Sequence, residues 1–366
     1  MSERVYLCAL SDPITDRSRY EKLKPEFEKQ GIVLELSPLL EKDLPAPTKA
    51  DDFNKALRSG RYSWIVDVSG GNLANLVLPY LDYEAYQSGS TYYAAFSDGT
   101  CIVNALAARA HKKAMLFPIW NQTDFGQTIL LFKTRKMPAA IEPMNQANPM
   151  PRHGRIFGGN IRCFLKLAGT DGFPDLSDGY LLLESSSANW NAFRSMSAHL
   201  AQIGALDSLC GIILGRFNVL ERQAQGRENA LRLMAAYLDS LLIDSVDFYR
   251  ADGIGHIANS QGIWISAGKP LLKQGHSPFW QSEAGKESAS QKTQEMPKPG
   301  PVQKPIGASP TPPRKQGNDH HRIKTNPEVN NMTGNNGETS KNKPHSYTIS
   351  TGDVYITPFA SSKKRQ

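Results

Sequence analysis

The sequence predicts an α/β protein built on a mostly parallel sheet, and three observations support that prediction. Short apolar runs that suit buried strands alternate with amphipathic stretches that suit helices. Several predicted strands end in small or polar residues, and the carboxyl ends of strands are where α/β sheets bind ligands. The chain of 366 residues is also long enough for two domains with cores of their own.

The first predicted domain spans residues 1–137 and is a doubly wound sheet. Its apolar runs at 5–10 and 32–36 suit buried strands, and the charged stretch 17–30 between them has the spacing of an amphipathic helix. The same rhythm predicts helices over 51–59, 73–80, 101–108 and 127–136, and strands over 64–68, 92–96 and 114–119.

Residues 138–153 are predicted to link two domains, because Pro138, Pro143, Pro149 and Pro151 interrupt regular structure there. A second, smaller α/β domain follows over 154–275. Its pattern predicts helices over 161–167, 191–203 and 227–242, and strands over 179–184 and 210–215. The folded part is expected to end near residue 272.

Residues 276–366 have the composition of a disordered tail, rich in Lys, Pro, Gly, Ser and Asn with little to bury. This segment holds 13 Lys and Arg against 7 Asp and Glu, so it accounts for six of the seven net positive charges of the chain. The rest is nearly neutral, and the basic balance is therefore no argument for a nucleic-acid site.

The start of the chain has no basic segment followed by an apolar one, and no apolar run approaches the roughly 20 residues that span a bilayer. We expect a cytoplasmic protein without a membrane span. Cys8, Cys101, Cys163 and Cys210 are widely spaced in apolar contexts, which suits reduced core thiols. The histidines lack metal-ligand spacing, so neither a metal nor a cofactor is expected.

The stretch 92–108 carries the main candidate for chemistry. Ser97 falls where a predicted strand becomes a predicted helix, with the small residues Ala95 and Gly99 on either side. A serine on such a tight turn is exposed as a nucleophile, and the helix start behind it offers free N–H groups to an oxyanion. The residues alone favour a plainer interpretation, in which Ser97 caps the helix.

Three other features allow both a functional and a plainer interpretation. Glu184 ends a buried strand, where a carboxylate needs a partner. His256 lies between Gly255 and Ile257, which is more typical of a loop histidine than of a base. The Gly70-Gly71 turn precedes a helix but lacks the glycine spacing and the lysine of a phosphate-binding loop.

Several blocks, in this order, resemble the LD-carboxypeptidase family. This family of serine peptidases includes the muramoyltetrapeptide carboxypeptidases and the microcin C immunity peptidases. The resemblance covers about residues 3–272 and leaves out the tail. The blocks are Ser-Gly-Gly-Asn-Leu to Leu-Pro-Tyr-Leu-Asp-Tyr-Glu (69–84), Phe-Ser-Asp-Gly-Thr (96–100), Gly-Gly-Asn-Ile-Arg to Leu-Ala-Gly-Thr (158–170), Gly-Tyr-Leu-Leu-Leu-Glu (179–184), Gly-Ile-Ile-Leu-Gly-Arg-Phe (211–217) and Gly-His (255–256).

The resemblance implies a catalytic triad in which Ser97 is the nucleophile, Glu184 the acid and His256 the base. The N–H groups of Asp98, Gly70 and Gly71 would form the oxyanion hole, and Asn160 would contact the substrate. The implied substrate is a murein tetrapeptide, cleaved between L-Lys or diaminopimelate and the terminal D-Ala. Members of the family are commonly homodimers and need no metal.

The chain departs from the family at several positions. Ser69 stands where Arg is common, Ala95 where Gly is common, Phe96 where Tyr is usual, Gly99 where an aliphatic residue is usual and Ile257 where Gly is usual. These changes leave two alternatives open. One is an immunity-type amidase that cleaves a peptidyl- or aminoacyl-nucleotide. The other is a binding paralogue that keeps the fold but not the catalytic rate.

Overall fold

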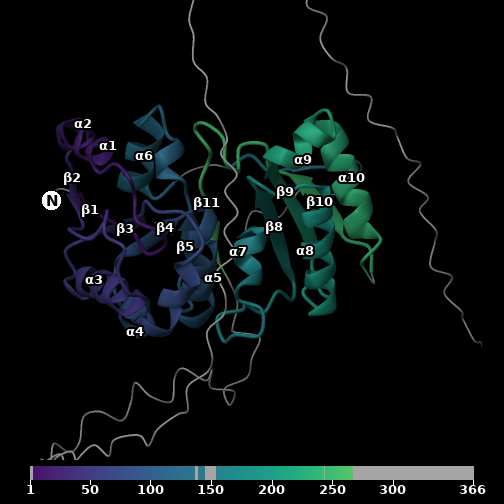
Figure 1. Cartoon of the computed structure of the whole chain (residues 1–366), viewed down its shortest axis with the longest axis horizontal. Coiled ribbons are helices and arrows are strands. Elements are labelled where there is room, and N and C mark those ends of the chain that lie inside the picture. Colours follow the sequence, from purple (N-terminus) through teal and green to yellow (C-terminus); the bar gives the residue numbers. More distant parts are fainter. Residues whose placement is uncertain (1–2, 137–138, 145–153, 243, 267–366) are drawn as a thin grey trace, which may run out of the picture. The chain divides into compact units, whose positions relative to one another are not determined.

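The first sheet has the strand order β11-β5-β4-β3-β1-β2 (Figure 1). The computed structural model describes residues 3–136, 139–144, 154–242 and 244–266. All strands of this sheet run parallel except β11, which pairs antiparallel with β5. The strands are β1 (Glu3–Cys8), β2 (Ile32–Leu36), β3 (Trp64–Asp67), β4 (Tyr92–Ala95), β5 (Ala114–Leu116) and β11 (Ile263–Ile265).

The order of these strands confirms the predicted doubly wound sheet. The chain reverses its direction of winding between β1 and β3, and in such sheets ligands bind beside the strand ends at that point. The loops that follow β1 and β3 both lie there, and the turn that contains Ser97 follows the neighbouring β4. The strand β11 was not predicted, because its three residues are too short to stand out in the sequence.

Two predicted helices of this part differ in the structure. The stretch 17–30 forms two short helices, because Pro25 lies in the first turn of α2 and suits a helix start better than a helix interior. The stretch 73–80 is a 3-10 helix with Pro79 inside it. The helices are α1 (Ser18–Glu21), α2 (Lys24–Lys29), α3 (Ala46–Arg58), η1 (Ala74–Tyr80), α4 (Tyr83–Ser88), η2 (Ser97–Gly99), α5 (Thr100–Arg109), η3 (Ile119–Asn121) and α6 (Gly126–Thr134).

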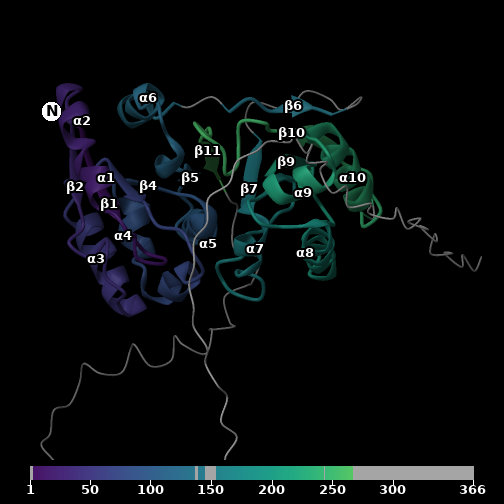
Figure 2. The ribbon, with the colours of Figure 1, turned by 45° about the horizontal axis from the view of Figure 1, so that its top comes forward.

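The second sheet has the order β6-β10-β9-β8-β7, with β6 alone antiparallel to its neighbour. Figure 2 shows β6 beside β10. The edge strand β6 lies inside the predicted linker 138–153. The strands are β6 (Glu142–Pro143), β7 (Arg155–Asn160), β8 (Gly179–Ser185), β9 (Gly211–Phe217) and β10 (Asp247–Arg250), and the helices are α7 (Ile161–Leu165), α8 (Trp190–Gln202), α9 (Asn218–Gln223) and α10 (Arg227–Asp239).

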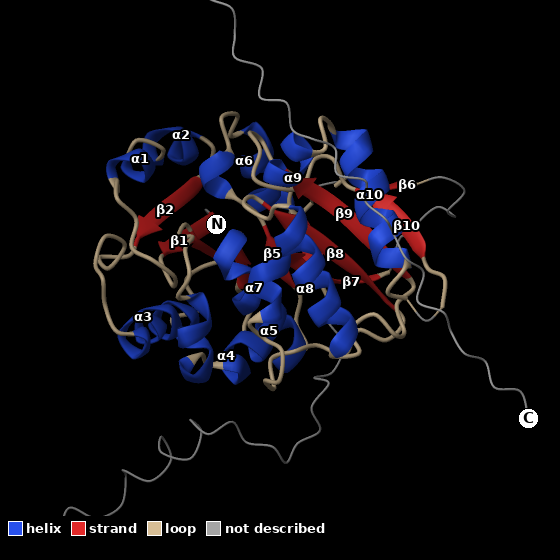
Figure 3. Ribbon diagram, turned by 45° about the vertical axis from the view of Figure 1, so that its right-hand side comes forward, coloured by secondary structure: helices blue, strands red, loops and turns tan. Residues whose placement is uncertain are grey.

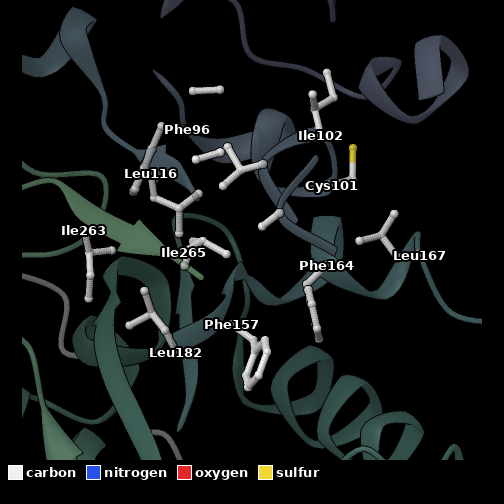
Figure 4. Packing of buried hydrophobic residues seen from close by; sticks show 14 of the residues in the cluster. Phe96, Cys101, Ile102, Leu116, Phe157, Phe164, Leu167, Leu182, Ile263 and Ile265 are labelled. Carbon is white, nitrogen blue, oxygen red and sulfur yellow. The ribbon is translucent and has the colours of Figure 1, made fainter. Parts of the chain in front are cut away.

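The helix α5 joins the two sheets. Residues 100–108 are all buried, so this helix has no solvent face, in keeping with its apolar sequence. Figure 3 shows α5, α7 and α8 side by side over the strands. In Figure 4, side chains of α5 and β5 meet Phe157, Phe164 and Leu182 from the second sheet and its helix, in one continuous core.

One polar side chain in this core fixes how α5 meets β7. The Asn104 amide donates to the Gly158 carbonyl at 2.8 Å and accepts from the Gly158 N–H at 2.9 Å. Gly158 and Gly159 have positive φ angles of 90° and 129°. A Cβ on Gly159 would lie 2.7 Å from Leu116 and 3.0 Å from Thr100, so only glycine allows this close approach.

Three of the four cysteines are buried free thiols, as predicted, but Cys210 is exposed and the core assignment was wrong for it. It lies directly before β9, where the chain enters the sheet from the surface. Within the described residues, no helix is long and apolar enough to cross a bilayer. The predicted tail 276–366 and the end of the fold near 272 lie outside the described residues.

Candidate active site

Ser97 sits in a strained turn at the end of β4. Its φ angle is 55°, a left-handed conformation that a residue other than glycine adopts at a cost of about 1–3 kcal/mol. A Cβ on Gly99 would lie 2.5 Å from the Cβ of Ala95, so the turn needs its small residues. Phe96 is the N-cap of η2 and Gly99 that of α5, so the capping interpretation of Ser97 was wrong.

The carboxylate of Asp98 holds this turn from behind. It is inaccessible to solvent and accepts from the Ser11 hydroxyl at 2.7 Å and from the Ala74 N–H at 2.8 Å. Its other oxygen forms an ion pair with Lys166, and Arg162 lies 3.8 Å away. Burial alone would raise the pKa of Asp98, but these donors outweigh it and lower the pKa below its usual range.

The Gly70-Gly71 turn follows β3 and is anchored by Ser69. The Ser69 hydroxyl donates to Asp67 at 2.5 Å and accepts from the Ser11 N–H at 3.0 Å. Burial raises the pKa of Asp67 to about 6, although the hydrogen bonds from Ser69 and its other donors oppose the shift. In the described part of the chain, the N–H groups of Gly70 and Gly71 donate to no acceptor.

Glu184 and His256 form a hydrogen-bonded pair. Glu184 is fully buried at the end of β8, and its carboxylate lies 2.9 Å from His256 Nδ1. The Asn160 amide, opposite Glu184 in the register of β7 and β8, donates to the other carboxylate oxygen at 3.0 Å. Burial lowers the pKa of His256, but the hydrogen bond and the negative charge of Glu184 outweigh burial and raise it above its usual value.

The loop that carries His256 is shaped by glycine. Gly255 has a φ angle of 150°, and a Cβ there would lie 2.5 Å from the Cβ of Arg216. The Asn218 amide donates to the His256 carbonyl at 2.9 Å. Gly215 leaves room for Glu184 on the neighbouring strand, since a Cβ on it would lie 3.0 Å from that of Glu184.

Phe96 connects the two halves of the site. Its ring centroid lies 5.1 Å from that of His256, so the imidazole packs against the residue that precedes Ser97. Hydrogen bonds run from Asn160 through Glu184 to His256. Among the hydrogen bonds of the described residues, none joins the Ser97 hydroxyl to His256.

The side chain of Asn160 is placed differently from the expected substrate contact. It is 5% exposed, its amide nitrogen binds Glu184, and its oxygen caps α7 by accepting from the Cys163 N–H at 3.4 Å. These contacts orient the carboxylate of Glu184. A direct contact between Asn160 and substrate stays a prediction.

Sequence reasoning missed the residues that support the site. Asn104 was detectable, because a lone amide in the apolar run 101–108 needs buried partners. Lys166 and Arg162 carried no signal, since they resemble solvated charges on a short helix. Within the described residues, no three His, Cys, Asp or Glu side chains are grouped as a metal site requires.

The fold is of the α/β class, and it places a serine on a strained turn next to a buried Glu–His pair. Two family models agree with it and together match more than half of the chain: the LD-carboxypeptidase N-terminal domain over residues 5–116 and the LD-carboxypeptidase C-terminal domain over 153–265. The chain belongs to the LD-carboxypeptidase family. The division into domains at 138–153 stays a prediction that agrees with the gap between the two matches.

Similar proteins include members of two groups. The putative carboxypeptidase VC_A0337 of Vibrio cholerae serotype O1 is 24% identical and aligns over 57% of this chain and 75% of its own. The muramoyltetrapeptide carboxypeptidase from Oxalobacter formigenes has a TM-score of 0.60 at 18% identity, over 72% of this chain and 92% of its own. The microcin C7 self immunity protein MccF has a TM-score of 0.59 at 18% identity, over 72% and 91%. At these identities, the two structures support the shared fold alone.

Proposed function

We propose that this chain is a serine-type LD-carboxypeptidase that releases the terminal D-Ala from murein tetrapeptides. The observation that supports it best is the pairing of a strained serine turn with a buried Glu184–His256 pair whose imidazole packs against that turn. A strained strand-to-helix turn is the setting of the nucleophile in many α/β hydrolases.

In the proposed reaction, Ser97 Oγ attacks the carbonyl carbon of the L,D-peptide bond while His256 Nε2 accepts the hydroxyl proton. The carbonyl oxygen becomes an oxyanion, which the N–H groups of Gly70, Gly71 and Asp98 would stabilise. His256 then protonates the leaving amine, so that D-Ala departs and an acyl-enzyme remains. Water hydrolyses that ester with His256 again as base, which restores Ser97.

Glu184 serves this cycle through its contact with Nδ1. The hydrogen bond keeps the Nδ1 proton in place, so that Nε2 is the nitrogen free to accept a proton. The charge of Glu184 also stabilises the imidazolium that forms during attack. Asn160 keeps the carboxylate turned toward His256.

The test compares D-Ala release from a muramoyl tetrapeptide by the wild type and by Ser97→Ala. We expect kcat to fall by about 10⁴-fold or more, because the nucleophile is lost. Ser208→Ala, on an exposed serine without a side-chain contact, is the matched control. Equal release by the wild type and Ser97→Ala would refute the proposal.

A second candidate is supported by Trp120, which lies edge-on to Phe96 with a centroid distance of 6.3 Å and is partly exposed. An aromatic side chain near the candidate base could stack on a nucleobase. The reaction would then be amide cleavage in a peptidyl- or aminoacyl-nucleotide. Assays with both substrate types on the same preparation decide between the two reactions.

The remaining alternative is a paralogue that binds without catalysis. A fluorophosphonate probe separates it from both enzymes, because the probe labels only an activated serine. Labelling of the wild type at Ser97 supports catalysis. A folded protein that resists labelling supports the binding paralogue. The proposal also includes a cytoplasmic location and a homodimer, the latter testable by light scattering.

A further inference from the structure

Arg162 brings a positive charge to the turn proposed as the oxyanion hole. It lies two residues after Asn160, and its guanidinium donates to the Gly71 carbonyl at 3.0 Å and to the Asn72 side chain at 2.9 Å. Arg162 therefore reaches from α7, beside the second sheet, to a loop of the first sheet. Nothing in the proposed reaction uses this charge.

The neighbours of Arg162 do not fully neutralise its positive charge or use all of its donors. Asp98 is neutralised by Lys166, which forms the shorter ion pair, while Arg162 stays at 3.8 Å. A guanidinium has five N–H donors, of which the two hydrogen bonds to the turn use two. The side chain of Arg162 is 44% exposed, so its remaining donors are not all enclosed by protein.

Another charge sets where an anion can bind. The carboxylate of Asp12 packs against Gly71, where a Cβ would lie 2.0 Å from its Oδ2. In the described part of the chain, no cation pairs with Asp12. A ligand carboxylate is therefore favoured beside Arg162 and disfavoured beside Asp12.

The substrate of a carboxypeptidase presents a carboxylate at this place. The terminal carboxylate carbon is three bonds from the scissile carbonyl carbon, so it lies near the oxyanion hole when the carbonyl oxygen occupies that hole. An endopeptidase substrate has a neutral amide there. A planar guanidinium matches a carboxylate with two parallel hydrogen bonds.

We propose that Arg162 binds the terminal carboxylate of the substrate and thereby makes this chain a carboxypeptidase rather than an endopeptidase. This inference rests on the proposed function. The positioning of Arg162 depends on Lys166, which neutralises Asp98 and also donates to the Asn72 carbonyl at 2.8 Å.

The experiment measures binding without turnover. Ser97→Ala protein is titrated by calorimetry with N-acetyl-L-lysyl-D-alanine and with its C-terminal amide. We expect the acid to bind about 10- to 100-fold more tightly than the amide, as a charge-assisted hydrogen bond implies. Adding Arg162→Met should abolish this difference, and Arg162→Lys should keep part of it. Arg232→Met, on an exposed arginine without an ion pair, should leave it unchanged.

The outcomes separate this inference from the proposed function. Equal binding of acid and amide to the Ser97→Ala protein refutes the role of Arg162. A preference for the acid that survives Arg162→Met refutes it too. An equal loss of affinity for both ligands also refutes it, because it would indicate a structural role for Arg162. If the wild type fails to hydrolyse the acid peptide while the preference is present, the proposed reaction is lost and the carboxylate site stands. Thermal melts check folding, and Arg162→Lys decides if Arg162→Met does not fold.

Discussion

The Ser97 turn and the His256 loop each stand beside a carboxylate that solvent does not reach, and the two carboxylates have different partners. Asp98 is paired with Lys166 in an ion pair. Glu184 is paired with His256, a group whose charge changes near neutral pH. Under the proposed reaction, the first carboxylate supports structure and the second supports proton transfer.

The two regions also differ in which parts of the fold supply their contacts. Glu184 and Asn160 are direct neighbours on adjacent strands. Asp98 instead gathers Ser11 from the loop after β1, Ala74 from η1 and Lys166 from the segment after α7. The nucleophile turn therefore depends on the second sheet for its support, even though it belongs to the first.

The largest expected effect comes from the pair of Glu184 and His256, which is proposed to transfer protons. Glu184→Gln preserves the shape of the side chain but removes the charge that stabilises the imidazolium, and we expect kcat to fall by about 10³- to 10⁴-fold. Steady-state assays of D-Ala release measure it. A fall of less than tenfold would contradict the role assigned to Glu184.

The next effect concerns the structural carboxylate. Lys166→Met leaves the buried Asp98 carboxylate without its close cation, and we expect the free energy of unfolding to fall by about 3–5 kcal/mol. Urea denaturation measures the loss. Adding Asp98→Asn should recover part of it, because the uncompensated charge is removed. Lys133→Met, at an exposed lysine, should change stability by less than about 0.5 kcal/mol.

A smaller effect is expected from crowding the Ser97 turn. Gly99→Ala places a methyl group 2.5 Å from the Ala95 Cβ, so the strand and helix must move apart. We expect a loss of about 1–3 kcal/mol in the free energy of unfolding. The double variant Ala95→Gly with Gly99→Ala should recover part of this loss. Additive effects of the two changes would show that the contact does not limit the turn.

The smallest expected effect is a shift in the pH dependence of kcat/KM. A base must be neutral, and Glu184 raises the pKa of His256 above 6.5, so kcat/KM should rise with pH through an apparent pKa above 6.5. In the residual activity of Glu184→Gln, this rise of kcat/KM should occur at lower pH than in the wild type. A rise at the same pH in both proteins would contradict the pairing of Glu184 with His256.

The raised pKa of His256 also makes the free energy of unfolding depend on pH. The folded-state pKa of His256 lies above its unfolded value near 6.5. The pair with Glu184 therefore contributes its full stabilisation below about pH 6.5 and loses it as the pH rises through the raised pKa. The difference in unfolding free energy between wild type and Glu184→Gln, measured across this range, should follow that course.

The sequence predicted the sheet class, the strands before Ser97 and Glu184, and the need of Glu184 for a partner, because strand burial leaves a local pattern of apolar residues. The identity of that partner came only from the family resemblance, since His256 lies 72 positions away in a glycine-rich loop. Local residues alone favoured capping for Ser97.

The support of the site could not be predicted, because it depends on contacts between distant segments. The ion pair of Lys166 with Asp98 joins positions 68 residues apart, and neither residue stands out locally. The strand β11 is too short to be recognised in the sequence. Its partner β5 comes before all strands of the second sheet along the chain, whereas β11 comes after them. Asn104 was the exception, as a polar residue in an apolar helix.

The strand β11 makes completion of the first sheet depend on the last described part of the chain. On the ribosome, β5 is made well before β11, and its outer edge stays without this partner until Ile263–Ile265 emerge. An unpaired edge of this kind invites association with other chains. We expect nascent chains that stop before β11 to need chaperones, and the candidate active site to form only after the whole second sheet has been translated.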